Sequence, residues 1–197
     1  ILILIFTFKK DTFKKDTFEI IKGIKVPIGL SSDHQKMDIH SSLYNRYMKE
    51  QYYILDQFVQ FLESKHILHS LIAGSLIGYY TIGEALPWDD DIDISVHSND
   101  WNVMDTLWNT GKNYRKYTNY IFYYNWEACD ITLNDKPFVL IRPYGYKGWY
   151  SIVTKWMEQF KKKDVGGLDI FKVVDNNGIL VEELNGTKTK APGPTNN

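Results

Sequence analysis

The apolar residues between Lys36 and His66 follow a helical pattern. They recur largely at intervals of three and four residues, which places them on one face of an α-helix. This face comprises Leu43, Tyr47, Ile54, Leu55, Phe58, Val59 and Leu62. The pattern therefore predicts one long amphipathic helix or two shorter ones. The other aromatic residues of the segment, including Tyr52, Tyr53 and Phe61, are attributed to core packing.

Shorter apolar runs that follow predict alternating strands and helices. The run "ILHSLIAG" is typical of a buried strand that ends at Gly74, and a short helix is expected to begin at Ser75. The run "DIDISV" alternates acidic and apolar or small residues with the period of a β-strand. This alternation places Asp91 and Asp93 on one face of the strand and the two isoleucines on the other.

The second half of the chain begins with one further helix and continues with strands. Ser98 is a suitable N-cap, and Gly111 is expected to end the helix. The buried side of this helix comprises Trp101, Met104, Leu107 and Trp108. The runs "YIFYY", "ACDITL" and "PFVLIRP" are rich in aromatic and β-branched residues and predict strands. The stretch "GLDIFKVVDNNGILVEEL" predicts a β-hairpin that turns at "NNG".

Composition indicates one domain with a sizeable core, because 44% of the 197 residues are hydrophobic and 24% are charged. The net charge of -1 provides no basic excess and argues against a general nucleic-acid binder. The single cysteine, Cys129, excludes an intrachain disulfide and a cysteine-based zinc site. The five histidines lack metal-ligand spacing, and nucleophile-elbow and Walker-type motifs are absent, so hydrolase and P-loop functions are disfavoured.

The two ends of the chain differ from the central part. The first eight residues, "ILILIFTF", are too few to cross a bilayer, which needs about 20. They are interpreted as a β-strand or apolar terminus, or as the stub of a truncated membrane anchor. The tail "NGTKTKAPGPTNN" is polar and rich in glycine and proline, which predicts disorder. We therefore divide the chain into an N-terminal apolar and basic segment (1–35), a central domain (36–184) and a disordered tail (185–197).

Four acidic residues, Asp89, Asp90, Asp91 and Asp93, lie within five positions. Alternate side chains of a strand share a face and lie about 6.5–7 Å apart, so Asp91 and Asp93 are within reach of one cation. A Mg2+ or Mn2+ ion bound to their oxygens would offset the charge repulsion. Asp89 has the same parity and is expected to join this metal site, whereas Asp90 has the opposite parity.

A solvated acidic turn is the alternative interpretation of this cluster. Pro87 and Trp88 immediately before it, and the apolar strand after it, argue against a flexible loop. The Gly74-Ser75 pair upstream predicts a phosphate-binding helix start, because backbone N-H groups and the helix dipole attract anions there. A plain tight turn is the alternative for this pair.

The stretch "AGSLIGYYTIGEALPWDDDIDISV" resembles the signature of the LicD/fukutin family, in which G-[ST]-L-L-G is followed at this spacing by P-W-D-D-D-I-D. The matching positions are Gly74, Ser75, Leu76, Gly78, Pro87, Trp88, Asp89, Asp90, Asp91, Ile92 and Asp93. "GLDIF", with Asp169, is similar to the second motif of the family. The resemblance implies an α+β fold with a nucleotidyltransferase-like mixed β-sheet flanked by helices.

The resemblance also implies a reaction. Members of the family move a phosphorylated alcohol or sugar, such as phosphocholine or ribitol phosphate, from a CDP-activated alcohol or nucleotide-sugar donor to a glycan hydroxyl. Asp91 and Asp93, joined by Asp89, would hold Mg2+ or Mn2+, and Gly74 and Ser75 would bind the donor phosphate.

Further residues have candidate roles. Asp169 is the candidate base for the acceptor hydroxyl, with a carboxylate paired to Lys or Arg as the alternative. Because "GLDIFKVV" is apolar on both faces, we expect Asp169 on a neighbouring strand, about 5–7 Å from the other carboxylates. Asp89, Asp90, Trp88 and Arg142 are candidate substrate-binding residues. Arg142 lies in an aromatic-rich stretch that suits a cytidine ring or a sugar, or packs in the core.

One departure from the family pattern bears on activity. The family commonly has Ala-Val-Arg-His after the second glycine, whereas this chain has "YYTI", residues 79–82. The alternative function is therefore a catalytically degenerate module that binds a glycan or regulates a partner transferase. The resemblance implies the Golgi or another secretory lumen with an N-terminal anchor, as in eukaryotic relatives, or the cytoplasm, as in bacterial ones. The apolar N-terminus favours the membrane-associated form.

Overall fold

The computed structural model describes residues 18–21, 24–27, 42–86, 89–118, 125–159, 166–176 and 179–182. The chain divides into two units, Ile1–Lys36 and Met37–Asn197. Within the first unit, β1 (Phe18–Ile21) and β2 (Ile24–Pro27) form an antiparallel pair. The expectations for "ILILIFTF", "YIFYY", Trp88 and the C-terminal tail concern segments outside the described residues.

The second unit contains an eight-stranded mixed sheet with the order β3-β4-β9-β8-β7-β6-β5, in which β10 pairs with β9. The strands are β3 (His69–Leu71), β4 (Ile92–His97), β5 (Lys112–Thr118), β6 (Asn125–Leu133), β7 (Lys136–Pro143), β8 (Trp149–Val153), β9 (Leu168–Asn176) and β10 (Ile179–Glu182). β4 and β9 are parallel, and the other neighbouring pairs are antiparallel. The helical elements are α1 (Ser42–Ser64), α2 (Ala73–Ile82), η1 (Ser98–Asp100), α3 (Asn102–Asn109) and α4 (Lys155–Glu158).

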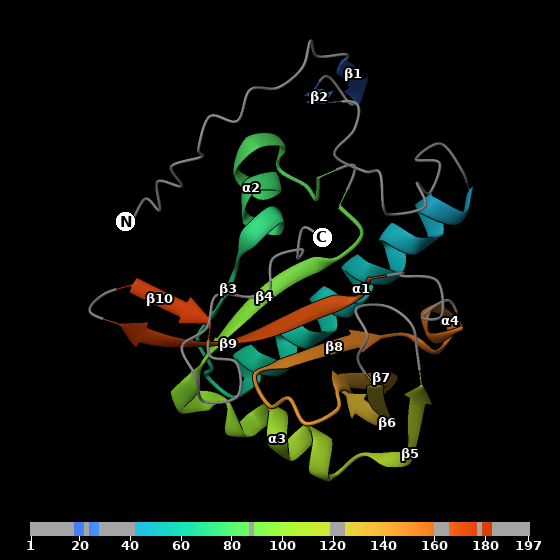
Figure 1. The fold of residues 1–197 in the computed structure, drawn as a ribbon, viewed down its shortest axis with the longest axis vertical. Helices are drawn as coiled ribbons and strands as arrows, with labels where there is room; N and C mark the ends of the chain where they lie inside the picture. Colours follow the sequence, from blue (N-terminus) through green and yellow to red (C-terminus); the bar gives the residue numbers. More distant parts are fainter. Residues whose placement is uncertain are drawn as a thin grey trace. The chain divides into compact units, whose positions relative to one another are not determined.

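The predicted mixed sheet with flanking helices is thus present. In Figure 1 the strands β4, β9 and β8 lie side by side, and α1 crosses behind them. None of the helices in the described part of the chain combines the length and the apolar character needed to cross a membrane.

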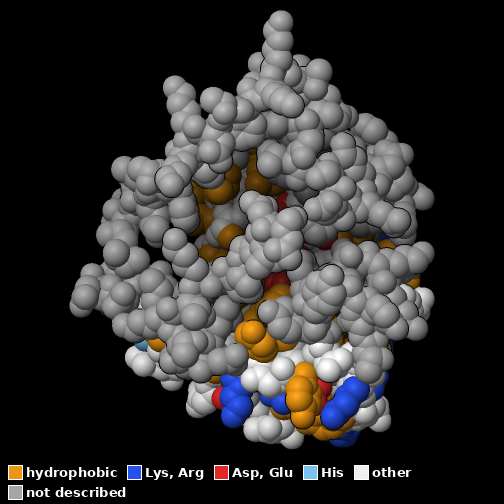
Figure 2. Space-filling model, in the orientation of Figure 1, with side chains coloured by type: hydrophobic (Ala, Val, Ile, Leu, Met, Phe, Trp, Pro, Cys, Tyr) orange, Lys and Arg blue, Asp and Glu red, His pale blue; other side chains and the backbone are white. Residues whose placement is uncertain are grey.

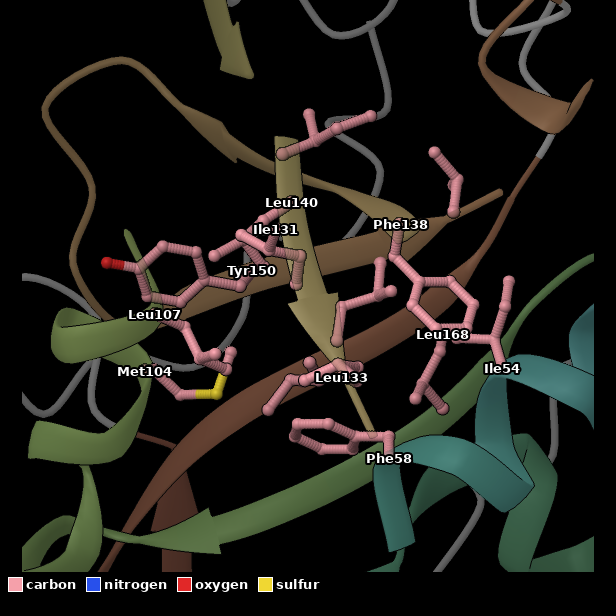
Figure 3. Packing of buried hydrophobic residues seen from close by; sticks show 14 of the residues in the cluster. Ile54, Phe58, Met104, Leu107, Ile131, Leu133, Phe138, Leu140, Tyr150 and Leu168 are labelled. Atoms are coloured by element: carbon pink, nitrogen blue, oxygen red, sulfur yellow. The ribbon is translucent and has the colours of Figure 1, made fainter. Parts of the chain in front are cut away.

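One face of the sheet packs against α1 and α3 and forms the main core. Because directly paired residues share a face, Leu168, Ile152, Leu140 and Cys129 form one buried row across four strands. Figure 3 shows side chains of α1 (Ile54, Phe58) and α3 (Met104, Leu107) pointing at this face. Fully burying one such side chain contributes about 1.5–3 kcal/mol.

The long helix is confirmed as one element, α1, and its predicted apolar face is buried at Tyr47, Ile54, Phe58 and Leu62 and partly buried at Leu55 and Val59. Core packing was the wrong interpretation for two of its aromatic residues: Tyr52 and Tyr53 are 40% and 41% exposed. Tyr52 accepts a hydrogen bond from the Ala85 N-H, and Tyr53 contacts the Phe138 ring at the edge of the core. Their position on the flank of the helix explains this difference.

Several boundaries differ from the sequence prediction. β3 is a half-exposed strand rather than a buried one, because it lies at the edge of the sheet and pairs only with β4. Gly74 lies inside α2, which begins at Ala73, and Ala73 has a left-handed φ of +48°. Ser98 begins the 3-10 turn η1 instead of capping α3. The predicted β9–β10 hairpin is confirmed by the pairing of Asn176 with Ile179.

Candidate active site

The parallel pairing of β4 and β9 brings three carboxylates together. Asp93 and Asp169 are direct partners in the register, so their side chains leave the same face of the sheet. Asp91 lies at the entry to β4, and one oxygen each of Asp91, Asp93 and Asp169 lies within 4.8 Å of the others. The predicted location of Asp169 next to Asp91 and Asp93 is thereby confirmed. Figure 2 shows acidic side chains among hydrophobic ones near the centre of this view.

Asp89 and Asp90 adjoin this cluster. Together with Asp91 they form a second group whose carboxylate oxygens lie within 4.8 Å of one another, so Asp91 belongs to both groups. The Asp89 side chain hydrogen-bonds to Asp91 and lies against Gly74. A Cβ built on Gly74 would lie 2.3 Å from Asp89 Oδ2. The sequence predicted that a donor phosphate approaches the backbone at Gly74. In this structure the Asp89 carboxylate lies at that position.

Ser75 connects the first turn of α2 to the cluster. Its side chain is buried, and its hydroxyl oxygen accepts the backbone N-H of Asp93 at 2.8 Å. The Ile72 N-H donates to the Asp93 carbonyl at 3.1 Å. Both backbone polar groups of Asp93 are thus held by residues at the start of α2. This arrangement fixes the direction of the Asp93 side chain.

The glycines of "GSLIG" explain how the acidic segment reaches the helix. Gly74 and Gly78 lie one turn apart on α2, and a Cβ on Gly78 would lie 2.5 Å from the Glu84 carbonyl oxygen. At Gly78 only a residue without a side chain lets the returning backbone lie directly against the helix, and at Gly74 it leaves room for the Asp89 carboxylate. The motif therefore positions Asp89, independently of any bound phosphate.

We predict that Gly74→Val impairs donor binding more than folding, because the new side chain displaces Asp89 from its contact with Asp91 in the acidic cluster. The new side chain meets the end of a flexible Asp89 side chain, which can move away, so we expect a loss of roughly 1 kcal/mol or less of stability, about 2–4 °C in Tm. Gly78→Ala is the control, since its Cβ meets backbone atoms at 2.5 and 2.9 Å and should cost folding stability instead. Calorimetric titration with a CDP-alcohol and thermal unfolding give both readouts. Unchanged donor affinity in Gly74→Val would contradict the prediction.

Burial and mutual repulsion control the charge state of the acidic cluster. Burial, followed by repulsion from Asp169 and Asp93, raises the pKa of Asp91 to about 10. Burial also raises the pKa of Asp89, with repulsion from Asp90 adding to it and the hydrogen bond to Asp91 opposing it. Three hard oxygen ligands with this excess of negative charge fit a divalent cation such as Mg2+ or Mn2+.

We predict that the free energy of unfolding of the metal-free protein falls as the pH rises. Asp91 has a pKa of 3.8 when unperturbed and about 10 in the folded protein, so between these values the folded state holds a proton that the unfolded state has released. The contribution of Asp91 to the free energy of unfolding is therefore greatest at low pH and is lost progressively as the pH rises towards 10. Asp91→Asn should flatten the curve. Urea unfolding in EDTA at pH 5 to 9 tests this, and parallel curves for the two proteins would contradict it.

Trp149 was not singled out by the sequence and contacts the cluster directly. Its indole N-H donates to Asp169 Oδ2 at 3.1 Å. The ring stacks on Phe171, with centroids 5.8 Å apart and planes at 13°, and meets the edge of Trp126 at 5.2 Å. These two aromatic neighbours fix the indole, which thereby orients the Asp169 carboxylate. The aromatic-rich sequence around Trp149 was the only signal for it.

Two further residues of α1 contact the acidic segment: Tyr47, which the sequence placed only in a helical pattern, and Gln51, which the sequence did not single out. Both are buried and donate to the backbone carbonyl of Asp90. No local sequence feature links them to the acidic cluster, because the contact spans about forty positions of the chain, 43 for Tyr47 and 39 for Gln51.

Arg142 does not join the cluster. Ile141 pairs with Ser151, which pairs with Asp169, so these three share a face and Arg142 points to the other one. There Arg142 forms an ion pair with Glu127 at 3.2 Å and lies 3.9 Å from the centre of the Trp108 ring. Its proposed place beside the donor is corrected accordingly, because strand alternation directs the guanidinium towards α3.

The mixed sheet, its flanking helices and the three carboxylates gathered at the starts of two parallel strands define an α/β domain with an acidic centre. Residues 66–191 match the family described as LicD/FKTN/FKRP, nucleotidyltransferase domain. The match covers more than half of the 197 residues, and the chain therefore belongs to the LicD/FKTN/FKRP family. A search of curated proteins found no match to the chain. The sequence resemblance to the LicD/fukutin family is confirmed.

Proposed function

We propose that this chain is a metal-dependent transferase that moves a phosphorylated alcohol or sugar from a CDP-activated donor to a glycan hydroxyl. The observation that carries the proposal is the group formed by Asp91, Asp93 and Asp169, whose oxygens lie within 4.8 Å of one another. Membership of a family of transferases supports it. We further propose that the sheet is a nucleotidyltransferase fold.

The residues of the cluster fit a resident Mg2+ or Mn2+ ion. Asp91 and Asp93 would hold it, and Asp89, hydrogen-bonded to Asp91, extends the set of oxygen ligands, while Asp169 lies beside them. When bound, such an ion acts as a Lewis acid that stabilises charge on the donor diphosphate. Ser75 holds the backbone of Asp93, and the first turn of α2 offers a positive dipole end for a donor phosphate.

Asp169 is the proposed general base. It is 7% exposed, and the Trp149 indole holds its Oδ2 atom, so the carboxylate has a fixed orientation. In the proposed reaction the acceptor hydroxyl oxygen forms a bond to the transferred phosphorus, the bond from phosphorus to CMP breaks, and Asp169 takes the hydroxyl proton. Asp91 and Asp93 would hold the ion and take no part in this proton transfer.

The second candidate function is a catalytically degenerate module that binds a glycan or regulates a partner transferase. The specific observation in its favour is the absence of an arginine from α2, the helix in which the family commonly carries one. This helix contains no charged residue, and Tyr79 and Tyr80 are exposed on it. Mn2+-dependent cleavage of a CDP-alcohol by the isolated chain would favour the transferase, and donor binding without cleavage would favour the module.

Thermal unfolding in the presence of candidate donors tests the proposed function. CDP-choline, CDP-ribitol, CDP-glycerol and GDP-mannose are each added with and without Mn2+. A donor that binds the folded state stabilises it by about 2.7 kcal/mol at a hundredfold excess over Kd. We expect one CDP-activated donor to raise the Tm only when Mn2+ is present. A Tm that no donor raises in the presence of Mn2+ would contradict the proposal.

A further inference from the structure

Two polar side chains of α1 reach the backbone on which the acidic cluster is built. The Tyr47 hydroxyl lies 2.8 Å from the Asp90 carbonyl oxygen and also hydrogen-bonds to the Gly166 carbonyl. Gln51 Nε2 donates to the same Asp90 carbonyl at 2.6 Å and to the Tyr47 hydroxyl at 3.3 Å. Both residues are almost fully buried, at 1% and 0% exposure.

The two carbonyls belong to the segments that precede β4 and β9, and these segments lie in direct contact. A Cβ built on Gly166 would lie 2.2 Å from the Asp90 carbonyl oxygen and 2.8 Å from Asp91 Cβ. The Ile92 N-H donates to the Gly167 carbonyl at 3.0 Å immediately beyond this point. The separation of the two segments therefore fixes the separation of Asp91 from Asp169.

Polar side chains on the buried face of a helix need a specific reason to be there. Ile54 and Phe58, further along the same face of α1, are apolar and pack in the main core. Tyr47 and Gln51, by contrast, supply donors to two backbone carbonyls that both lie against the Tyr47 hydroxyl and that would lack these donors without them. Their spacing of one helical turn aims both side chains at the same point.

We infer that Tyr47 and Gln51 are positioning residues that hold the Asp91 segment against the Asp169 segment, at the spacing that a divalent cation bound by Asp91 and Asp93 requires. This inference rests on the proposed metal-dependent function. The pair acts through the backbone: the hydroxyl lies between the Asp90 and Gly166 carbonyls and shares its one proton with them, and the amide donates one N-H to the hydroxyl and the other to the Asp90 carbonyl. Loosening this connection lets the carboxylates move apart under their mutual repulsion.

The test compares two buried tyrosines by their effect on Mn2+ affinity in the full chain. Tyr47→Phe removes the hydroxyl and keeps the ring. Tyr150→Phe is the matched control, because Tyr150 is also fully buried and its hydroxyl bonds to Asp105 and Arg142, on the face of the sheet opposite to Asp169. Calorimetric titration gives the Mn2+ affinity, and thermal unfolding in EDTA gives the stability of each variant.

We expect Tyr47→Phe to weaken Mn2+ binding about tenfold or more, as for other residues that support metal ligands. Tyr150→Phe should leave the affinity within about twofold, even where the two variants lose similar stability. Gln51→Met, which removes the amide and keeps a side chain of similar length, should weaken Mn2+ binding in the same direction. If Tyr47→Phe does not fold, Gln51→Met is compared with Tyr150→Phe in its place.

The outcomes separate this inference from the proposed function. Wild-type protein that binds Mn2+ together with unchanged affinity in Tyr47→Phe and Gln51→Met would overturn the inference and leave the proposed function standing. Equal losses of affinity in Tyr47→Phe and Tyr150→Phe would also overturn it, as would failure of both α1 variants to fold while Tyr150→Phe folds. Wild-type protein that binds no Mn2+ would overturn the proposed function itself.

Discussion

Asp91→Asn is expected to reduce Mn2+ affinity by on the order of a hundredfold or more, because affinity depends on the number of charged ligands and Asp91 belongs to both carboxylate groups. The same substitution should raise the free energy of unfolding of the metal-free protein by on the order of 1 kcal/mol or more. In the wild-type folded state Asp91 must either take up a proton or keep its charge against repulsion by Asp169 and Asp93. The neutral amide of asparagine avoids both costs. Calorimetry and urea unfolding in EDTA measure the two effects.

Asp130→Asn is the matched control for this result. Burial alone would raise the pKa of Asp130, but hydrogen bonds from Lys155, Asn113 and Arg115 outweigh it and lower the pKa to about 2. The same chemical change should therefore destabilise the protein and leave Mn2+ affinity unaltered. Destabilisation by both substitutions, or undiminished Mn2+ affinity in Asp91→Asn, would contradict the assignment of the acidic cluster.

Asp169→Asn is expected to lower turnover by about a thousandfold at saturating Mn2+ while changing donor affinity little, which is the size of effect typical of a lost general base. The amide oxygen can still accept the Trp149 N-H, so the orientation of the side chain should persist. Measurement of kcat, KM and donor Kd separates a chemical role from a binding role.

The control for Asp169→Asn is Asp135→Asn in the turn between β6 and β7. Asp135 is exposed and has a φ of +62°, a conformation that asparagine adopts readily. It should retain wild-type turnover. A kcat in Asp169→Asn within tenfold of the wild-type value, or a loss that appears only in donor affinity, would exclude Asp169 as the base.

The part of the site that sequence predicted depends on short-range patterns. Period-two alternation gave the shared face of Asp91 and Asp93, and the cost of burying an isolated charge placed Asp169 on an adjacent strand. Both arguments use neighbouring residues and general energetics. The parallel register of Asp93 with Asp169 was then a geometric consequence of that adjacency.

The remaining features depend on contacts that the sequence does not encode locally. Tyr47 bonds to Gly166 across 119 positions, and its place in a helical pattern indicated only a core residue. Arg142 was misplaced because its face is set by pairing across three strands, from Ile141 through Ser151 to Asp169. The early start of α2 follows from a left-handed Ala73, a conformation that alanine rarely adopts.

Calorimetric titration of the full chain with Mn2+ near pH 7, in two buffers that differ in ionisation enthalpy, tests the central claim most directly. Burial and repulsion by Asp169 and Asp93 raise the pKa of Asp91 to about 10, so we expect the metal-free acidic cluster to hold a proton near pH 7 and to release it when the ion binds. We predict Mn2+ binding whose apparent enthalpy depends on the buffer, and loss of that binding in Asp91→Asn and Asp93→Asn. Absence of Mn2+ binding to the wild-type chain, or equal affinity in both variants, would contradict the account.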